Sequence, residues 1–120
     1  MTSHLHSLAI DAHDPKALAR FWCEVLNYRI DEEEEDFVSA SPNEGQSLRL
    51  DFIQVPEGKT VKNRLHLDIR ASDSNQDAEV ARVESLGASR VDVGQTSKDS
   101  WVVLADPEGN EFCILSDRQE

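Results

Sequence analysis

Residues 66–73, H-L-D-I-R-A-S-D, repeat the pattern of residues 7–14, S-L-A-I-D-A-H-D, at an offset of 59 positions. Both stretches alternate aliphatic and polar side chains, which is typical of a β-strand with one buried face. Each stretch ends on an acidic residue, Asp14 or Asp73, of a type that often caps a helix. Because the pattern occurs twice, the sequence predicts two modules that each open with a strand followed by a helix.

Apolar residues at helical spacing follow both strands, more strongly in the first module than in the second. They are Leu18, Phe21, Trp22, Val25 and Leu26 in the first module and Val80, Val83 and Leu86 in the second. Asp14 followed by Pro15 is a favourable start for the first helix. Ser74 and Asp77 have the spacing of a capping box, and Gly87 supplies a stop for the second helix.

Three further strand-like stretches follow each helix. They span roughly 28–32, 36–40 and 47–55 in the first module and roughly 89–93, 100–105 and 111–116 in the second. The turn before each last strand also repeats, as S-P-N-E-G-Q at 41–46 and D-P-E-G-N at 106–110. We therefore predict one α+β domain over residues 1–120, built from two tandem βαβββ modules at about 1–57 and 62–117.

The composition narrows the possible partners. A formal net charge of −12 argues against nucleic acid and against anionic membrane surfaces, because both attract basic proteins. No apolar run approaches the ~20 residues that span a bilayer, and no secretory signal is visible. With two cysteines and no disulfide pattern, we expect a cytoplasmic protein. The six acidic residues at 31–36 are interpreted as a solvated hairpin tip.

Three stretches carry a resemblance to a known family: F-W at 21–22, N-R-L-H-L-D at 63–68, and W-V-V-L-A-D-P-E-G-N-E-F-C at 101–113. Together with the paired βαβββ modules, they resemble the vicinal oxygen chelate superfamily, and within it the glyoxalase-like branch. The resemblance implies a curved mixed sheet around a cavity, and a homodimer. Members of the superfamily include metal-dependent isomerases, lyases and dioxygenases as well as metal-free proteins that sequester drugs, so the fold alone does not decide the chemistry.

The resemblance also implies four metal ligands, usually a histidine from the first strand and a glutamate from the last strand of each module. His66 occupies one of these positions, but Ser7 stands at the matching position of the first module. The glutamates are expected four residues after the glycine of each turn. Cys113 stands there in the second module and Arg49 in the first, although Asp51 would replace Arg49 if the register shifted by two. We therefore expect no conventional metal centre and no cofactor, and we disfavour a divalent ion bound at His66.

The polar face of the strands supplies the candidate site. His66 and Asp68 are the candidate catalytic residues, since a histidine beside a carboxylate suits proton transfer. The candidate ligand-binding residues are Ser7, Asp11, Arg49, Asp51, Arg64, Trp101 and Cys113. Two alternatives stay open: a salt-bridge ladder between strands, formed by Asp11, Arg49, Asp51, Asp68 and Arg70, and a role for Cys113 as a small, nearly apolar filler.

Two functions are consistent with this face. The first is metal-independent binding of a small molecule, with the acidic charge and Trp101 favouring cationic, partly aromatic ligands. The second is a lyase or isomerase that uses His66 as a general base or as a residual metal ligand. The sequence does not decide between these two functions, and it predicts neither a nucleic acid nor a membrane as partner.

Overall fold

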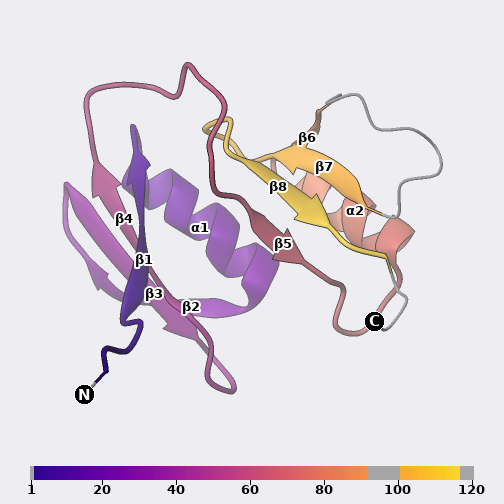
Figure 1. The fold of residues 1–120 in the computed structure, drawn as a ribbon, viewed down its shortest axis with the longest axis horizontal. Helices are drawn as coiled ribbons and strands as arrows, with labels where there is room; N and C mark the ends of the chain where they lie inside the picture. The colour runs from indigo at the N-terminus through magenta and orange to yellow at the C-terminus, as the bar shows by residue number, and fades with distance from the viewer. Residues whose placement is uncertain (1, 92–100, 117–120) are drawn as a thin grey trace. The chain divides into compact units, whose positions relative to one another are not determined.

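The computed structural model of the chain describes residues 2–91 and 101–116. The chain divides into two compact units, residues 1–58 and 59–120, each with one four-stranded mixed sheet and one helix (Figure 1). This confirms the α+β fold and the two βαβββ modules. Neither helix in the described part of the chain is long and apolar enough to cross a membrane.

The first unit follows the predicted order of elements. It contains β1 (Ser7–Ala12), α1 (Pro15–Leu26), β2 (Tyr28–Glu33), β3 (Phe37–Pro42) and β4 (Arg49–Gln54). The strands lie in the order β1-β4-β3-β2, with β1 parallel to β4 and the other pairs antiparallel. The acidic run begins inside β2 and continues through the turn that follows, and all six of its residues are exposed.

The second unit repeats this topology with shorter strands. It contains β5 (Leu67–Ile69), α2 (Gln76–Ser85), β6 (Ser89–Arg90), β7 (Val102–Ala105) and β8 (Glu111–Ile114), in the sheet order β5-β8-β7-β6. Leu65 lies before β5, which begins at Leu67, and it is 79% exposed. Residues 92, 93 and 100 of the predicted strands lie outside the described residues.

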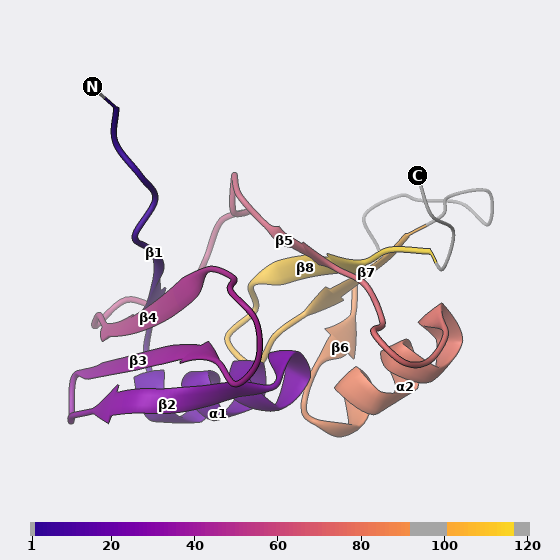
Figure 2. The same cartoon turned by 90° about the horizontal axis from the view of Figure 1, so that it is seen from below.

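One face of each sheet is covered by its helix (Figure 2). In the first unit the buried face of α1, including Trp22, packs on a sheet that contributes Leu50 and Phe52 from β4. The rings of Phe21 and Trp22 pack edge to face with centroids 5.1 Å apart. The apolar face predicted for this helix is therefore confirmed, except that Leu26 is only half-buried.

In the second unit Val80 and Val83 are the buried apolar residues of α2. Leu104, Phe112 and Ile114 are the most buried side chains of the sheet. Since side chains alternate along a strand, the residues between them point to the opposite face of the sheet.

The two helices begin in different ways. Asp14 caps α1 as predicted, because its Oδ1 accepts a hydrogen bond from the backbone N–H of Ala17 at 3.2 Å. The cap of α2 is Asn75, whose Oδ1 accepts from the N–H of Ala78 at 2.8 Å, so the predicted capping box at Ser74 is wrong by one residue. Asparagine caps a helix as well as serine does, and the two stand side by side in the sequence.

The corrected cap can be tested directly. We expect Asn75→Ala to lower the free energy of unfolding by about 1 kcal/mol, because the N–H of Ala78 loses its acceptor. Ser74→Ala is the matched control and should change that free energy by less than about 0.5 kcal/mol. Urea unfolding of both variants measures the difference, and an equal or larger loss in the Ser74 variant would contradict the assignment.

Candidate functional site

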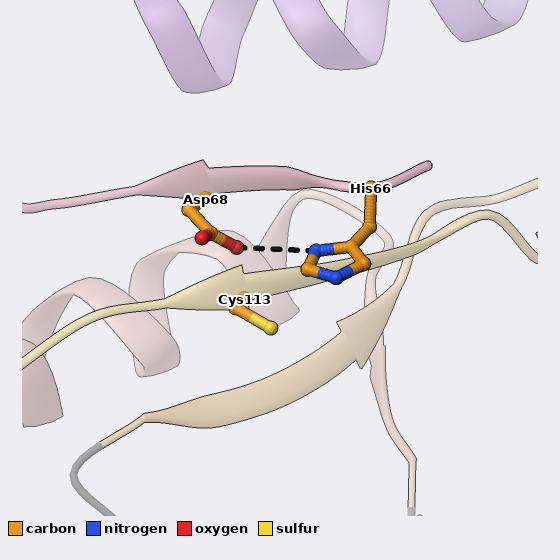
Figure 3. A group of neighbouring side chains, drawn as sticks. All are labelled: His66, Asp68 and Cys113. Atoms are coloured by element: carbon orange, nitrogen blue, oxygen red, sulfur yellow. Dashed lines mark hydrogen bonds and ion pairs between the residues drawn. The ribbon is translucent and has the colours of Figure 1, made fainter. Parts of the chain in front are cut away.

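The candidate site lies on the sheet face of the second unit that α2 does not cover. Strands β5 and β8 are parallel neighbours, and their register places Asp68 directly beside Cys113. Phe112 and Ile114 point into the core, so alternation sends the side chain of Cys113 to the other face. His66 immediately precedes β5, and its side chain lies with those of Asp68 and Cys113 (Figure 3).

These three side chains form one cluster. Nδ1 of His66 lies 3.1 Å from Oδ1 of Asp68. One potential ligand atom from each of His66, Asp68 and Cys113 falls within 4.8 Å of the other two. The side chains of His66 and Asp68 are 46% and 50% exposed, whereas Cys113 is only 9% exposed. The cluster therefore has a solvent-facing imidazole and carboxylate beside a buried thiol.

The surroundings keep the thiol protonated at neutral pH. Burial raises the pKa of Cys113 above its ordinary value, and the charge of Asp68 and a hydrogen bond to it raise that pKa further. Lys62 opposes this rise in part. Because the thiolate is the reactive form of cysteine, Cys113 by itself is a poor nucleophile at neutral pH.

The turn before β8 fixes where this strand begins. Oδ1 of Asp106 accepts hydrogen bonds from the backbone N–H groups of Glu108 at 2.9 Å and Asn110 at 3.0 Å. Gly109 has a φ of +90° and Gly45, in the related turn of the first unit, has a φ of +75°. Glycine adopts such values without strain, so the two related turns share a glycine in the left-handed region.

An ion pair that the sequence did not predict borders the cluster. Lys59 Nζ lies 3.3 Å from Glu111 Oε2, with both side chains less than 20% exposed. Burial raises the pKa of Glu111, but hydrogen bonds to its own backbone and to Lys59 outweigh this effect and lower it. Glu111 Oε1 is buried and has no partner in the described residues. The two residues are 52 positions apart in the sequence, and no local pattern connects them.

The other predicted site residues fall into two groups. Ser7, Asp11, Arg49 and Asp51 belong to the first unit, whereas Arg64 and Trp101 belong to the second, with the cluster. Arg64 is exposed in the segment before His66. Alternation along β7, continued one residue back, puts Trp101 on the side of Val103, the strand partner of Cys113. The prediction that both groups line one cavity stays a prediction.

Two members of the predicted salt-bridge ladder, Arg49 and Asp51, form an ion pair within β4. Arg49 Nε lies 2.9 Å from Asp51 Oδ1, and this hydrogen bond raises the pKa of Arg49 above its ordinary value. In the second unit Asp68 contacts His66 instead, while Arg70 Nε donates to the carbonyl oxygen of Ser116 at 3.0 Å. The Arg49–Asp51 pair lies within one strand, so it does not support a ladder between strands, and Asp68 contacts His66 instead of an arginine.

The strand registers change one correspondence between the modules. Ala9 pairs with Asp51 in the first unit, just as Asp68 pairs with Cys113 in the second. Asp51, not Arg49, therefore corresponds to Cys113, and counting from the turn glycine was misleading. The physical reason is turn length, because β4 begins four residues after its turn glycine and β8 only two.

The metal-ligand set implied by the resemblance does not fit these residues. Ser7 offers only a neutral hydroxyl, which lies 3.1 Å from Nδ1 of His6. Asp51 is a carboxylate, but it is already paired with Arg49. Cys113 provides sulfur where glutamate is implied, which leaves His66 as the single residue of the expected type.

The fold is thus that of an α+β protein with two βαβββ units and a polar cluster on the sheet of the second unit. The family model described as "Glyoxalase-like domain" matches residues 7–115. The chain therefore belongs to the glyoxalase-like domain family, which confirms the resemblance found in the sequence. No curated protein matches the chain significantly.

Solved structures share the fold at low sequence identity. A glyoxalase/bleomycin resistance protein/dioxygenase family enzyme from Burkholderia phytofirmans PsJN is 20% identical, with a TM-score of 0.72 over 93% of this chain and 97% of that one. Fosfomycin resistance protein FosX from Listeria monocytogenes, solved with Mn(II) and 1S,2S-dihydroxypropylphosphonic acid, is 12% identical, with a TM-score of 0.75 over 100% and 94%. A bleomycin-binding protein from Streptomyces verticillus, solved with copper(II)-bleomycin, is 19% identical, with a TM-score of 0.61 over 98% and 100%.

Proposed function

We propose that the protein binds a small cationic molecule on the polar sheet face around His66 and Asp68, and that this binding needs no metal centre. The observation that carries the proposal is the half-exposed Asp68 carboxylate, which projects beside His66 on the face that α2 leaves uncovered. A carboxylate in this position accepts charge-assisted hydrogen bonds from an ammonium or guanidinium group.

Other features of the chain favour a cation with an aromatic part. The net charge of −12 raises the local concentration of cationic molecules. Trp101, 40% exposed, lies on the side of the sheet that carries Cys113 and provides a ring face for stacking or for a cation–π contact. A bleomycin-binding protein of the same fold supports ligand sequestration as a use of this architecture.

The mismatch in the implied set of metal ligands supports binding without a metal. In the first unit, the metal-ligand positions that the resemblance implies hold no strong metal ligand. Ser7 offers a neutral hydroxyl, and Asp51 is paired with Arg49. Recognition therefore depends on hydrogen bonds, charge and stacking. The homodimer and the cytoplasmic location expected from the sequence remain predictions.

A lyase or isomerase that uses His66 as a general base is the second candidate. It is favoured by one observation, the 3.1 Å contact of His66 Nδ1 with Asp68, which orients the imidazole and leaves its other nitrogen for a substrate. An enzyme of this kind would convert small oxygenated substrates, and His66→Ala would abolish turnover while the fold stays intact.

Thermal-shift measurements test the proposal with a panel of cationic, partly aromatic antibiotics at up to millimolar concentration. We expect at least one compound to raise the unfolding midpoint, because it binds only the folded state, and this shift should persist when a chelator is present. Asp68→Asn should weaken binding about tenfold to hundredfold, since a hydrogen bond to a charged group is lost.

Asp73→Asn is the matched control, because Asp73 is an exposed aspartate outside the cluster, and it should bind like the unaltered protein. Failure of the whole panel to shift the midpoint would contradict the proposal. So would a shift that disappears when the chelator is added.

A further inference from the structure

We propose that His66, Asp68 and Cys113 form a binding site for a thiophilic divalent metal ion, with zinc as the ion that fits best. The site lies wholly within the second unit, and it goes beyond the proposed binding of organic cations without depending on it. It rests on the placement of three different donor atoms on two neighbouring strands.

The donor types select the ion. Imidazole nitrogen, thiolate sulfur and carboxylate oxygen are the three ligand types found in zinc sites. Magnesium and calcium prefer sites made of oxygen atoms, and His66 and Cys113 offer none. A soft or borderline ion such as zinc therefore suits this cluster, and hard ions do not.

The geometry requires a small adjustment. Bond lengths of 2.0–2.3 Å around a tetrahedral zinc ion separate the donor atoms by roughly 3.3–3.8 Å, and the three ligand atoms here lie within 4.8 Å of one another. The half-exposed side chains of His66 and Asp68 can rotate toward the buried sulfur of Cys113, whose position the core of β8 fixes. Three protein ligands leave a fourth position open to water or to a ligand.

Binding replaces a proton with the ion. The Cys113 thiol, which is hydrogen-bonded to Asp68, loses its proton to the solvent, and sulfur, carboxylate and imidazole then bind the ion together. The third metal ligand, Asp68, is supplied by the pairing of β5 with β8, because their register places it beside Cys113. The sequence alone suggests only His66 and Cys113 as ligands of such an ion, and two side chains hold an ion poorly.

This site differs from the set that the family resemblance implies. All three donors come from one unit, and Asp68 stands at a position to which the resemblance assigns no ligand. Sulfur replaces the carboxylate of glutamate, which shifts the preference from hard ions toward thiophilic ones. Organic cations and the metal ion would compete for the same carboxylate, so each should weaken binding of the other.

Cobalt(II) is the probe for the experiment, because a thiolate bound to it gives a charge-transfer absorption that carboxylate and imidazole ligands do not give. Tag-free, reduced full-length protein is titrated with Co²⁺ in the absence of other ligands. We expect this absorption to saturate at one ion per chain, to disappear when zinc is added, and to persist in excess magnesium.

Variants assign the donors. Cys113→Ser should abolish the absorption, and Cys23→Ser is the matched control that should keep it, since Cys23 lies on α1 in the other unit. His66→Ala and Asp68→Asn should each weaken cobalt binding by more than the roughly 10–100-fold that changes outside the ligand shell cost. His6→Ala controls for the loss of a histidine and should leave the affinity unchanged.

If Cys113→Ser fails to fold, the variants at His66 and Asp68 still decide the test, because both side chains are half-exposed. An unaltered protein without the charge-transfer absorption would overturn the inference, and so would His66→Ala and Asp68→Asn variants that bind cobalt normally. Cys113→Ser should still bind the cationic compounds of the thermal-shift panel, because it keeps Asp68. Loss of cobalt binding with retained antibiotic binding, or the reverse, therefore distinguishes failure of one proposal from failure of the other.

Discussion

Phe52→Ala is expected to lower the free energy of unfolding by about 3–5 kcal/mol, which is the usual cost of removing a buried aromatic ring. Phe52 is fully buried in β4, where it pairs with Ile10 of β1 and Val38 of β3. Its removal leaves a cavity between the sheet and α1 of the first unit. Because a domain is typically stable by only 5–15 kcal/mol, the variant should lose a large share of its stability.

The next residue along the strand provides the control. Ile53 is 37% exposed on the opposite face of β4, so Ile53→Ala should cost about 1 kcal/mol or less. Urea unfolding followed by tryptophan fluorescence measures both variants, since Trp22 is buried in the same unit. Similar losses in the two variants would show that β4 does not direct Phe52 into the core.

Phe112→Ala is expected to have a comparably large effect in the second unit, again about 3–5 kcal/mol. Phe112 is 1% exposed and stands between Glu111 and Cys113 on β8. The ring therefore anchors the strand that positions the buried thiol. Loss of the ring should weaken cobalt binding as well as lowering stability, although Phe112 itself offers no donor atom.

Phe112→Leu separates these two consequences. Leucine keeps most of the apolar volume, so we expect a loss below about 1.5 kcal/mol and near-normal cobalt affinity. Leu65→Ala, at a side chain that is 79% exposed, should change the stability by less than about 0.5 kcal/mol. Hydrogen exchange of the β8 amides measures the local effect. Unchanged protection in Phe112→Ala would contradict the anchoring role.

The internal repeat predicted the fold well because it depends on local signals. The sequence match of Leu8 with Leu67 and of Ile10 with Ile69 marks two equivalent strands, and in the structure each strand begins a βαβββ unit. Asp14 before Pro15 is a strong cap signal and was correct. Ser74 was wrong because Asn75 competes with it one residue later, and the choice depends on where the chain turns after β5.

The candidate site was predicted less completely because its geometry depends on contacts between distant residues. Alternation identified His66, Asp68 and Cys113 as members of one polar face. The sequence could not show that Asp68 stands beside Cys113, since this depends on the register of two parallel strands. The burial of Lys59 against Glu111 joins residues from opposite ends of the second unit, and no local pattern signals it.

The unequal turns before β4 and β8 carry a lesson for duplicated proteins. The stretch between the turn glycine and the next strand is two residues longer in the first unit than in the second, yet Asp51 and Cys113 still point to equivalent sides of their sheets. An insertion of two preserves the inside and outside of a strand, whereas a single inserted residue carried into the strand would exchange them. Duplicated modules can thus come to differ in length by an even number of residues while equivalent strand positions stay on the same face of the sheet.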